Sequence, residues 1–256
     1  MADYQTNFKR YEKKYLMDQN QYTVLREKLA GRIQADQYGL HTICNIYYDT
    51  GHYDLIRTSL SKPPYKEKLR LRSYGVPAEH DTVFLEIKKK FNGIVYKRRI
   101  SMDLAGAEAY LTHHNKPEKD GQILHEIDWF LRLYHPEPKV FIAYDRIACY
   151  DRFDPSLRIT FDQNIRFRDH ELSLSAGDWG DPVSKAGQVL MEIKLQGNMP
   201  LWLCHILNEL EIFPASFSKY GTCYTRFLMY EEVLDGSVPD PAQTDYPYTT
   251  GGIHFA

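Results

Sequence analysis

Alternation of charged and apolar residues constrains the fold of this chain more than any other feature. Residues 66–72 read KEKLRLR, so every second residue is basic. Successive side chains of a β-strand point to opposite faces. Lys66, Lys68, Arg70 and Arg72 therefore share one face, and the two leucines lie on the other. The segment predicts a strand with one basic face and one apolar face.

The same pattern recurs along the chain. Eight segments show period-two alternation or enrichment in β-branched and aromatic residues: residues 8–16, 41–49, 66–74, 82–90, 94–102, 139–150, 156–162 and 188–196. Five of them repeat the one-sided placement of charge: Arg10, Glu12 and Lys14; Glu86, Lys88 and Lys90; Lys97 and Arg99; Arg158 and Asp162; Glu192 and Lys194. A solvated face normally mixes charge signs because like charges side by side repel, whereas cations predominate here.

Amphipathic helices are predicted between the strands, at residues 20–30, 122–134 and 200–211, and a last helix is predicted at 221–234. An open sheet with one solvated face is the simplest alternative. A sheet with helices outside and cations inside is instead a closed barrel with a polar lumen. We therefore predict an α+β fold, an eight-stranded antiparallel β-barrel with a basic lumen and helices packed outside.

Composition favours one domain. The chain has 256 residues, 43% of them hydrophobic, and no Pro/Gly/Ser-rich linker. We expect a domain at 1–234 and a flexible tail at 235–256, which is rich in Pro, Gly and Thr. A net charge of -2 argues against a nucleic-acid binder. No apolar run reaches the ~18 residues of a membrane span, and four dispersed cysteines suit a reducing cytoplasm.

A triphosphate or a polyphosphate chain is the ligand that suits a lumen of this kind. Arg presents a planar fork to phosphate oxygens, and Lys adds point charge. Carboxylates among the cations predict a site for Mg²⁺ or Mn²⁺, which take hard oxygen ligands and bridge phosphate oxygens.

Several of these segments together resemble the VTC domain of polyphosphate polymerases, in a bacterial-type stand-alone form. This domain belongs to the CYTH-like triphosphate tunnel metalloenzymes. The matching segments, in the family's order, are residues 10–15 (RYEKKY), 68–72 (KLRLR), 85–88 (LEIK), 97–99 (KRR), 157–162 (LRITFD), 190–195 (LMEIKL) and 218–220 (SKY). Arg10 replaces the first Glu of the superfamily's E-x-E-x-K signature, which favours the polymerase-like branch over the cyclase and thiamine triphosphatase branches.

The resemblance implies a triphosphate tunnel and roles for particular residues. Four are expected to clamp the reacting phosphates: Arg70, Arg72, Lys88 and Arg158. Others, from the resemblance or from the strand faces, are expected to complete the phosphate-binding cage: Lys14, Lys68, Lys97, Arg99, Lys194 and Lys219. Glu192, with Glu12, is expected to hold the metal.

Three functions remain open on these residues. The first is a metal-dependent polyphosphate polymerase that transfers the terminal phosphate of ATP to a growing chain. The second is a tripolyphosphate or nucleoside triphosphate hydrolase in the same tunnel. The third is a non-catalytic sensor of polyphosphate or inositol phosphates, which would not need Glu192. The expected partners are ATP and polyphosphate or tripolyphosphate, with a separate membrane or export protein for any coupling to export.

Overall fold

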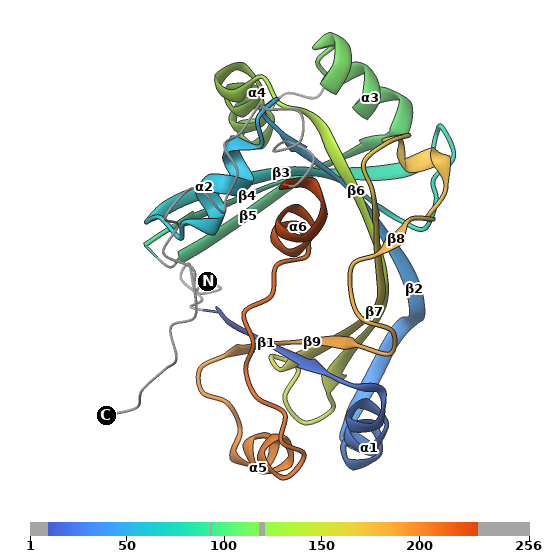
Figure 1. Cartoon of the computed structure of the whole chain (residues 1–256), viewed down its shortest axis with the longest axis vertical. Coiled ribbons are helices and arrows are strands. Elements are labelled where there is room, and N and C mark those ends of the chain that lie inside the picture. The colour runs from blue at the N-terminus through green and yellow to red at the C-terminus, as the bar shows by residue number, and fades with distance from the viewer. Residues whose placement is uncertain (1–9, 93, 118–120, 230–256) are drawn as a thin grey trace, which may run out of the picture.

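One antiparallel sheet forms the body of the protein in the computed structural model, which describes residues 10–92, 94–117 and 121–229 (Figure 1). Its strands in this part of the chain are β1 (Arg10–Met17), β2 (Ile33–Asp49), β3 (Tyr65–Tyr74), β4 (Thr82–Phe91), β5 (Ile94–Asp103), β6 (Glu137–Asp151), β7 (Arg158–Arg168), β8 (Asp181–Pro182) and β9 (Val189–Gln196).

The main strands lie in the order β1-β9-β7-β6-β2-β3-β4-β5, and the two-residue strand β8 pairs with β7. Every pairing is antiparallel. Figure 1 shows that the sheet is strongly curved, with a concave inner face. Among the described residues no backbone ladder joins the end strands β1 and β5. The predicted α+β tunnel fold with eight main antiparallel strands is confirmed.

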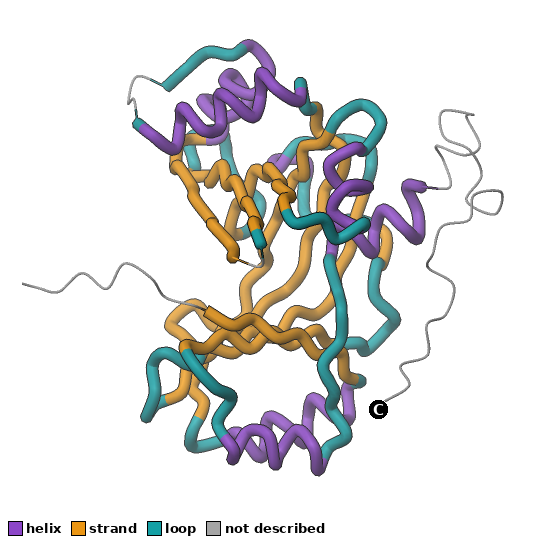
Figure 2. Tube along the Cα trace, turned by 90° about the vertical axis from the view of Figure 1, so that its left-hand side faces the viewer, coloured by secondary structure: helices purple, strands orange, loops and turns teal. Residues whose placement is uncertain are grey.

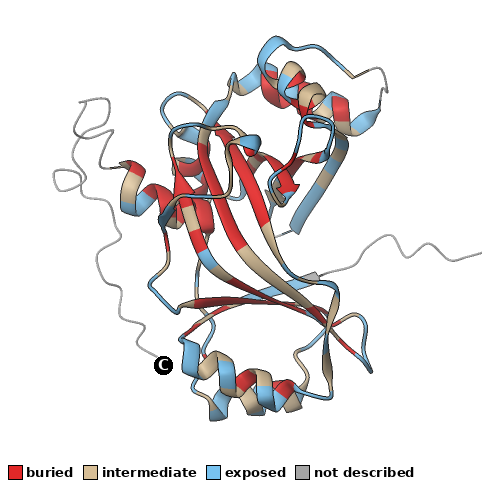
Figure 3. Cartoon of the chain, turned by 90° about the vertical axis from the view of Figure 1, so that its right-hand side faces the viewer, coloured by how far each residue is buried: buried red, intermediate tan, exposed pale blue. Residues whose placement is uncertain are grey.

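Two pairs of helices cover the outer face of the sheet. Helices α1 (Gln19–Leu29) and α5 (Leu201–Glu209) lie on the part formed by β1, β7 and β9 (Figure 2). Helices α3 (Leu104–His113) and α4 (Gln122–Tyr134) cover β3, β4 and β5. Figure 3 shows the buried residues concentrated in the strands at the centre of the sheet. Burial of apolar area at about 25 cal/mol per Å² drives this packing.

The last helix differs from the prediction. The structure has a short helix α6 (Lys219–Cys223) followed by a π-helical turn (Tyr224–Leu228), and the predicted residues beyond 229 lie outside the described part. This segment packs on the inner face of the sheet, where Tyr220 and Tyr224 share an apolar cluster with Ile43 and Ile142. The prediction that helices lie only outside was therefore wrong for α6.

Helix α2 (Asp54–Leu60) links this inner helix to the sheet. The fully buried Asp49 carboxylate, at the end of β2, accepts hydrogen bonds from the backbone N–H groups of Leu55 and Ile56, at 2.8 and 3.0 Å, and from the Tyr220 hydroxyl at 2.9 Å. A carboxylate at a helix N-terminus satisfies unpaired backbone donors. This contact fixes α6 against the inner face.

The sequence did not predict α2, α3, β8 or the first part of β2, residues 33–40. The tail at 235–256 lies outside the described residues. Within the described residues, no helix combines the length and apolarity needed to cross a bilayer.

Candidate active site

The two faces of β3 differ as the alternation predicted. Leu69 and Leu71 are buried in the cluster beneath the outer helices. Arg72 pairs in register with Asn45 and Arg70 with Tyr47 on β2, and both arginines bond to these partners on the inner face. The basic residues of β3 therefore lie on the concave inner side of the sheet, which we call the lumen.

Glu86 on β4 lies at the centre of a cluster of inward-facing cations, here called the Glu86 cluster. Its carboxylate pairs with Arg70 at 2.6 Å, with Lys97 at 2.9 Å and with Arg72 at 3.7 Å. Burial opposes ionisation of this acid, but the three cations lower the pKa of Glu86 to about 2. Burial lowers the pKa of Lys97 to about 8 although Glu86 opposes the shift.

A second cluster lies across the lumen on β6, β7 and β9 and is called the Glu192 cluster. Asp162 accepts two hydrogen bonds from Arg146, at 2.6 and 2.7 Å, and one from Lys219 at 2.5 Å. Glu192 pairs with Lys194 at 3.1 Å, Lys14 at 3.5 Å, Arg146 at 3.6 Å and Lys219 at 3.7 Å. Burial opposes the ionisation of Glu192, but these cations hold its pKa well below the usual range.

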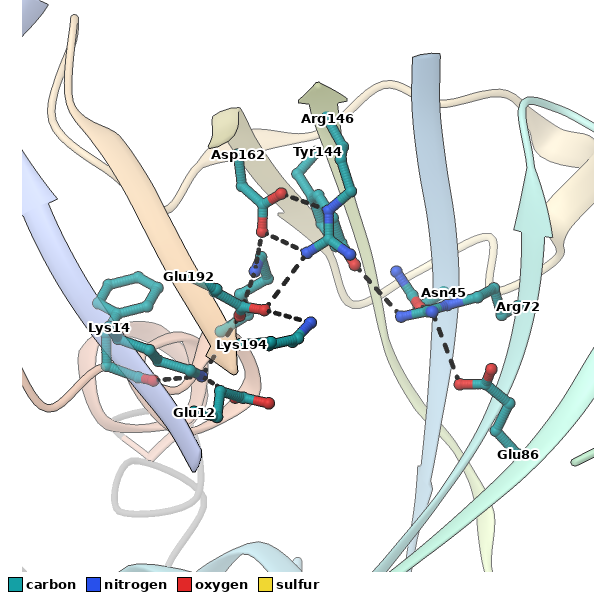
Figure 4. A network of polar contacts seen from close by, with 12 residues as sticks. Glu12, Lys14, Asn45, Arg72, Glu86, Tyr144, Arg146, Asp162, Glu192 and Lys194 are labelled. Atoms are coloured by element: carbon teal, nitrogen blue, oxygen red, sulfur yellow. Dashed lines mark hydrogen bonds and ion pairs between the residues drawn. The ribbon is translucent and has the colours of Figure 1, made fainter. Parts of the chain in front are cut away.

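Tyr144 joins the two clusters (Figure 4). Its hydroxyl accepts a hydrogen bond from Arg72 at 3.2 Å, and Lys219 lies 4.2 Å from the centre of its ring. Burial alone would raise the pKa of Tyr144, yet Arg146, Arg72 and Lys219 lower it to about 8. The Glu86 cluster and the Glu192 cluster therefore both contact the buried side chain of Tyr144.

Some inward-facing cations form no ion pair with the carboxylates that the structure describes. Within the described residues Lys68, Lys88, Arg99 and Arg158 make no ion pair with a carboxylate. Burial and the neighbouring Lys66 and Lys88 ammonium groups lower the pKa of Lys68 to about 7. Cations without partners in a semi-enclosed space favour an anionic ligand.

Charges also interact across the lumen. The side chain of Lys88 reaches solvent, but the protein around it removes part of its hydration. This desolvation is the main cause that lowers the pKa of Lys88. Among the charges that act on Lys88 are Glu12 and Lys14, which belong to β1 at the opposite end of the sheet order. The Lys88 side chain on β4 therefore lies within electrostatic range of the charges on β1.

The structure brings most of the predicted residues into these groups. Arg70, Arg72 and Lys97 belong to the Glu86 cluster. Lys14, Lys194 and Lys219 surround Glu192, and Glu12 contacts Lys14 at 3.9 Å. The remaining four residues belong to neither cluster: Lys68, Lys88, Arg99 and Arg158. Arg158 is exposed and pairs in register with Lys194.

Sequence reasoning missed Arg146, which bonds to both carboxylates of the Glu192 cluster. Arg146 is in register with Asp162 on β7 and shares the inner face with Tyr144. Period-two alternation from Tyr144 was the signal that could have found it. Asn45 and Tyr47 were missed because neutral residues carry no charge pattern.

The carboxylates match part of a metal site. Glu12 and Glu192 both contact the Lys14 ammonium, so they lie close to one another on β1 and β9. Among the described residues, no group of three or more His, Cys, Asp or Glu side chains is arranged to hold a metal. Mg²⁺ is commonly bound by one or two carboxylates together with substrate phosphates and water. Glu192 and Glu12 fit that donor set, with phosphate oxygens as the other ligands.

Comparison with known proteins gives a family and a fold. A family model described as the VTC domain matches residues 9–228. A candidate adenylate cyclase from Bacillus halodurans has a similar structure, with a TM-score of 0.52 and 14% identity over 84% of this chain and 95% of its own. A candidate adenylyl cyclase from Hippeastrum, described with a dominant triphosphatase activity, gives a TM-score of 0.48 and 15% identity over 91% of this chain and 98% of its own.

No curated protein matches the chain. At such low identity the Bacillus structure supports the fold alone. The family match covers most of the sequence and includes every strand of the lumen. The chain therefore belongs to the VTC domain family.

Proposed function

We propose that the protein is a metal-dependent polyphosphate polymerase, which transfers the terminal phosphate of ATP to a polyphosphate chain held in the lumen. The observation that supports this most is a set of inward-facing cations that make no ion pair with a carboxylate of the described residues, Lys68, Lys88 and Arg99. They lie beside two clusters whose arginines remain ordered by carboxylates. A linear polyanion can contact many such cations at once. Membership of the VTC domain family supports the same substrate class.

The transfer needs one bond to form and one to break. An oxygen of the terminal phosphate of the chain attacks the γ-phosphorus of ATP, and the bond to the bridging oxygen breaks as ADP leaves. The acceptor is itself a phosphate oxygen, so no protein nucleophile is required. Positioning and charge neutralisation contribute most of the rate in phosphoryl transfer.

In this proposal Arg70 and Arg72 orient the phosphates. Both are held by Glu86, and Arg72 also donates to Asn45 at 2.9 Å, so their guanidinium groups are ordered before ligand binds. Lys88 and Arg158 neutralise further oxygens, and Lys68 gains a proton as the polyanion approaches. Preorganised charges avoid the cost of reorganisation during the reaction.

Glu192 and Glu12 would hold the divalent metal, with Mg²⁺ and Mn²⁺ as the candidates. The metal, when bound, would supply positive charge that stabilises the negative charge on the phosphate oxygens. The Lys14 ammonium lies between these two carboxylates, at 3.9 and 3.5 Å. Lys14 is then expected to exchange a carboxylate for a phosphate oxygen when metal and substrate bind together.

The test is incubation of the purified protein with ATP and Mg²⁺ or Mn²⁺, with the products separated by chain length. Long polyphosphate with equivalent ADP supports the polymerase. Free phosphate with equivalent ADP and no new phosphate chain would instead establish hydrolysis in the same lumen. Binding without turnover under any of these conditions would identify a sensor. An Arg98→Ala variant, changed on the outer face of β5 where Arg98 pairs with Glu126 at 2.8 Å, is the matched control.

A further inference from the structure

A row of aromatic rings lies beside the basic lumen. The ring of Tyr38 is 6.2 Å from that of His41, His41 is 6.0 Å from Tyr74, and Tyr74 is 5.7 Å from Phe84. These four residues, called the aromatic row, come from β2, β3 and β4, which are neighbours in the sheet. Aromatic rings attract one another at such centroid distances.

The aromatic row continues the phosphate-binding face. Tyr74 follows Arg72 by two residues on β3, so both side chains point to the same side of the sheet. Phe84 is the register partner of Arg72 on β4. The guanidinium of Arg99, one of the cations without a carboxylate partner, lies 4.6 Å over the ring of Phe84. The rings and the phosphate-binding cations therefore belong to one surface.

Two members of the row are open to solvent. Tyr38 is 69% exposed and Tyr74 is 52% exposed, whereas Tyr47, Tyr144 and Tyr220 elsewhere on the inner face are buried. The register of β2 shifts between Ala35 and Leu40, at the segment that carries Tyr38. A bulge of this kind redirects side chains and often lies next to an active site.

We propose that the aromatic row binds the heteroaromatic base of a nucleoside triphosphate whose phosphates extend toward Arg72 and Arg70. This inference rests on the proposed function, since the phosphates occupy the same lumen. Two residues along a strand cover about 6.6 Å, which leaves room for a ribose between Tyr74 and Arg72. The row would then distinguish the nucleotide donor from the inorganic chain, which has no ring to stack.

Base stacking on an aromatic side chain is worth about 1–3 kcal/mol, or roughly 5- to 150-fold in affinity. Tyr74→Ala should therefore weaken ATP binding by about tenfold or more, and Tyr38→Ala by a smaller factor because Tyr38 lies farther from Arg72. Tripolyphosphate binding should change by less than about twofold in both variants. Tyr74→Phe keeps the ring and should bind ATP like the wild type.

Titration calorimetry with ATP and with tripolyphosphate, in the presence of Mg²⁺, measures both affinities. Phe213→Ala removes a ring that is 62% exposed and lies outside the aromatic row, and serves as the control. An equal loss of affinity for ATP and for tripolyphosphate in Tyr74→Ala would show damage to the phosphate cage and overturn the proposal. An ATP affinity unchanged from the wild type would overturn it as well. If the wild type binds tripolyphosphate but does not bind ATP, only the proposal of base recognition is overturned. If ATP binding depends on Tyr74 but the protein forms no polyphosphate from ATP, only the proposed polymerase activity is overturned.

Discussion

Arg70 directs two hydrogen bonds, of 2.8 Å from Nε and 2.6 Å from Nη2, to a single oxygen of Glu86 across β3 and β4. The second oxygen of Glu86 contacts Lys97 at 2.9 Å. The buried carboxylate is thus shared among cations that would otherwise repel one another, and a phosphate that entered the lumen would compete with it for them. Glu86 both orders the cage and limits its affinity.

Glu86→Gln should therefore have opposite effects on the free and the liganded protein. Loss of one partner of a buried ion pair typically costs about 3–5 kcal/mol, so the free variant should melt at a lower temperature. Its cations should bind tripolyphosphate more tightly, and the ligand should raise its melting temperature more than that of the wild type. Glu126 pairs with Arg98 and Lys89 on the outer face, so Glu126→Gln is the control. It should leave the ligand-induced rise in melting temperature unchanged. Equal shifts in Glu86→Gln and the wild type would contradict this role.

Arg72 is the next residue to test. It donates to Asn45 and to Tyr144, so Arg72→Ala should destabilise the free protein by about 1–3 kcal/mol. If repulsion among lumen cations dominated instead, Arg72→Ala would leave the free protein as stable as the wild type or more stable. Arg72→Ala should also weaken tripolyphosphate binding by roughly one to two orders of magnitude, and Arg72→Lys should recover only part of it because Lys lacks the planar fork. Melting curves with and without tripolyphosphate measure both effects. A ligand shift in Arg72→Ala as large as in the wild type would reject the clamp.

The strand faces could be predicted from sequence because alternation with period two is local. Leu69 and Arg70 are adjacent, and nothing distant is needed to place them on opposite faces. The pairing of charges is different. Lys14 donates to the backbone carbonyl of Phe217 at 2.9 Å, a contact between residues more than two hundred positions apart. No local pattern could predict that contact.

The inner position of α6 was also beyond sequence reasoning. Its five residues and the following π-helical turn are too short to show the periodicity of an amphipathic helix. Its placement depends on Tyr220, whose ring stacks on Tyr47 at 4.8 Å and whose hydroxyl reaches Asp49. Lys219 in turn reaches Asp162 only because α6 enters the lumen.

Lys68 makes the stability of the protein depend on pH. The pKa of Lys68 is about 7 in the folded state, mainly because of burial, against 10.5 as its ordinary value. Below pH 7 the ammonium is charged in both states and destabilises the fold. Between pH 7 and about 10.5 the unfolded chain binds the extra proton, so this contribution to stability rises with pH. Lys68→Met should thus stabilise the free protein by about 1–3 kcal/mol at pH 6, and by less at pH 9.

Urea unfolding of the wild type and of Lys68→Met at both pH values measures this difference. Lys13→Met is the control, since Lys13 is on the same sheet but its side chain is exposed and faces away from the lumen, next to Lys14 along β1. A stabilisation that does not change between pH 6 and pH 9 would show that packing of the methionine, and not the charge, causes it.

Substitution of Glu192 tests whether catalysis can be separated from binding. The carboxylate is surrounded by Lys14, Lys194, Lys219 and Arg146, at distances of 3.1 to 3.7 Å. If Glu192 holds the metal, Glu192→Gln should reduce turnover by at least about 100-fold, since loss of a metal ligand removes charge stabilisation of several kcal/mol. Tripolyphosphate binding without metal should persist or become tighter, because four cations lose a competing carboxylate. Turnover across a series of Mn²⁺ and Mg²⁺ concentrations, with metal-free binding measured in parallel, tests both statements.

Glu12→Gln should show a smaller loss of turnover, which a higher metal concentration restores, because the Glu12 side chain is 37% exposed against 9% for Glu192. Full turnover by Glu192→Gln at low metal concentration would assign Glu192 to ordering the surrounding cations alone.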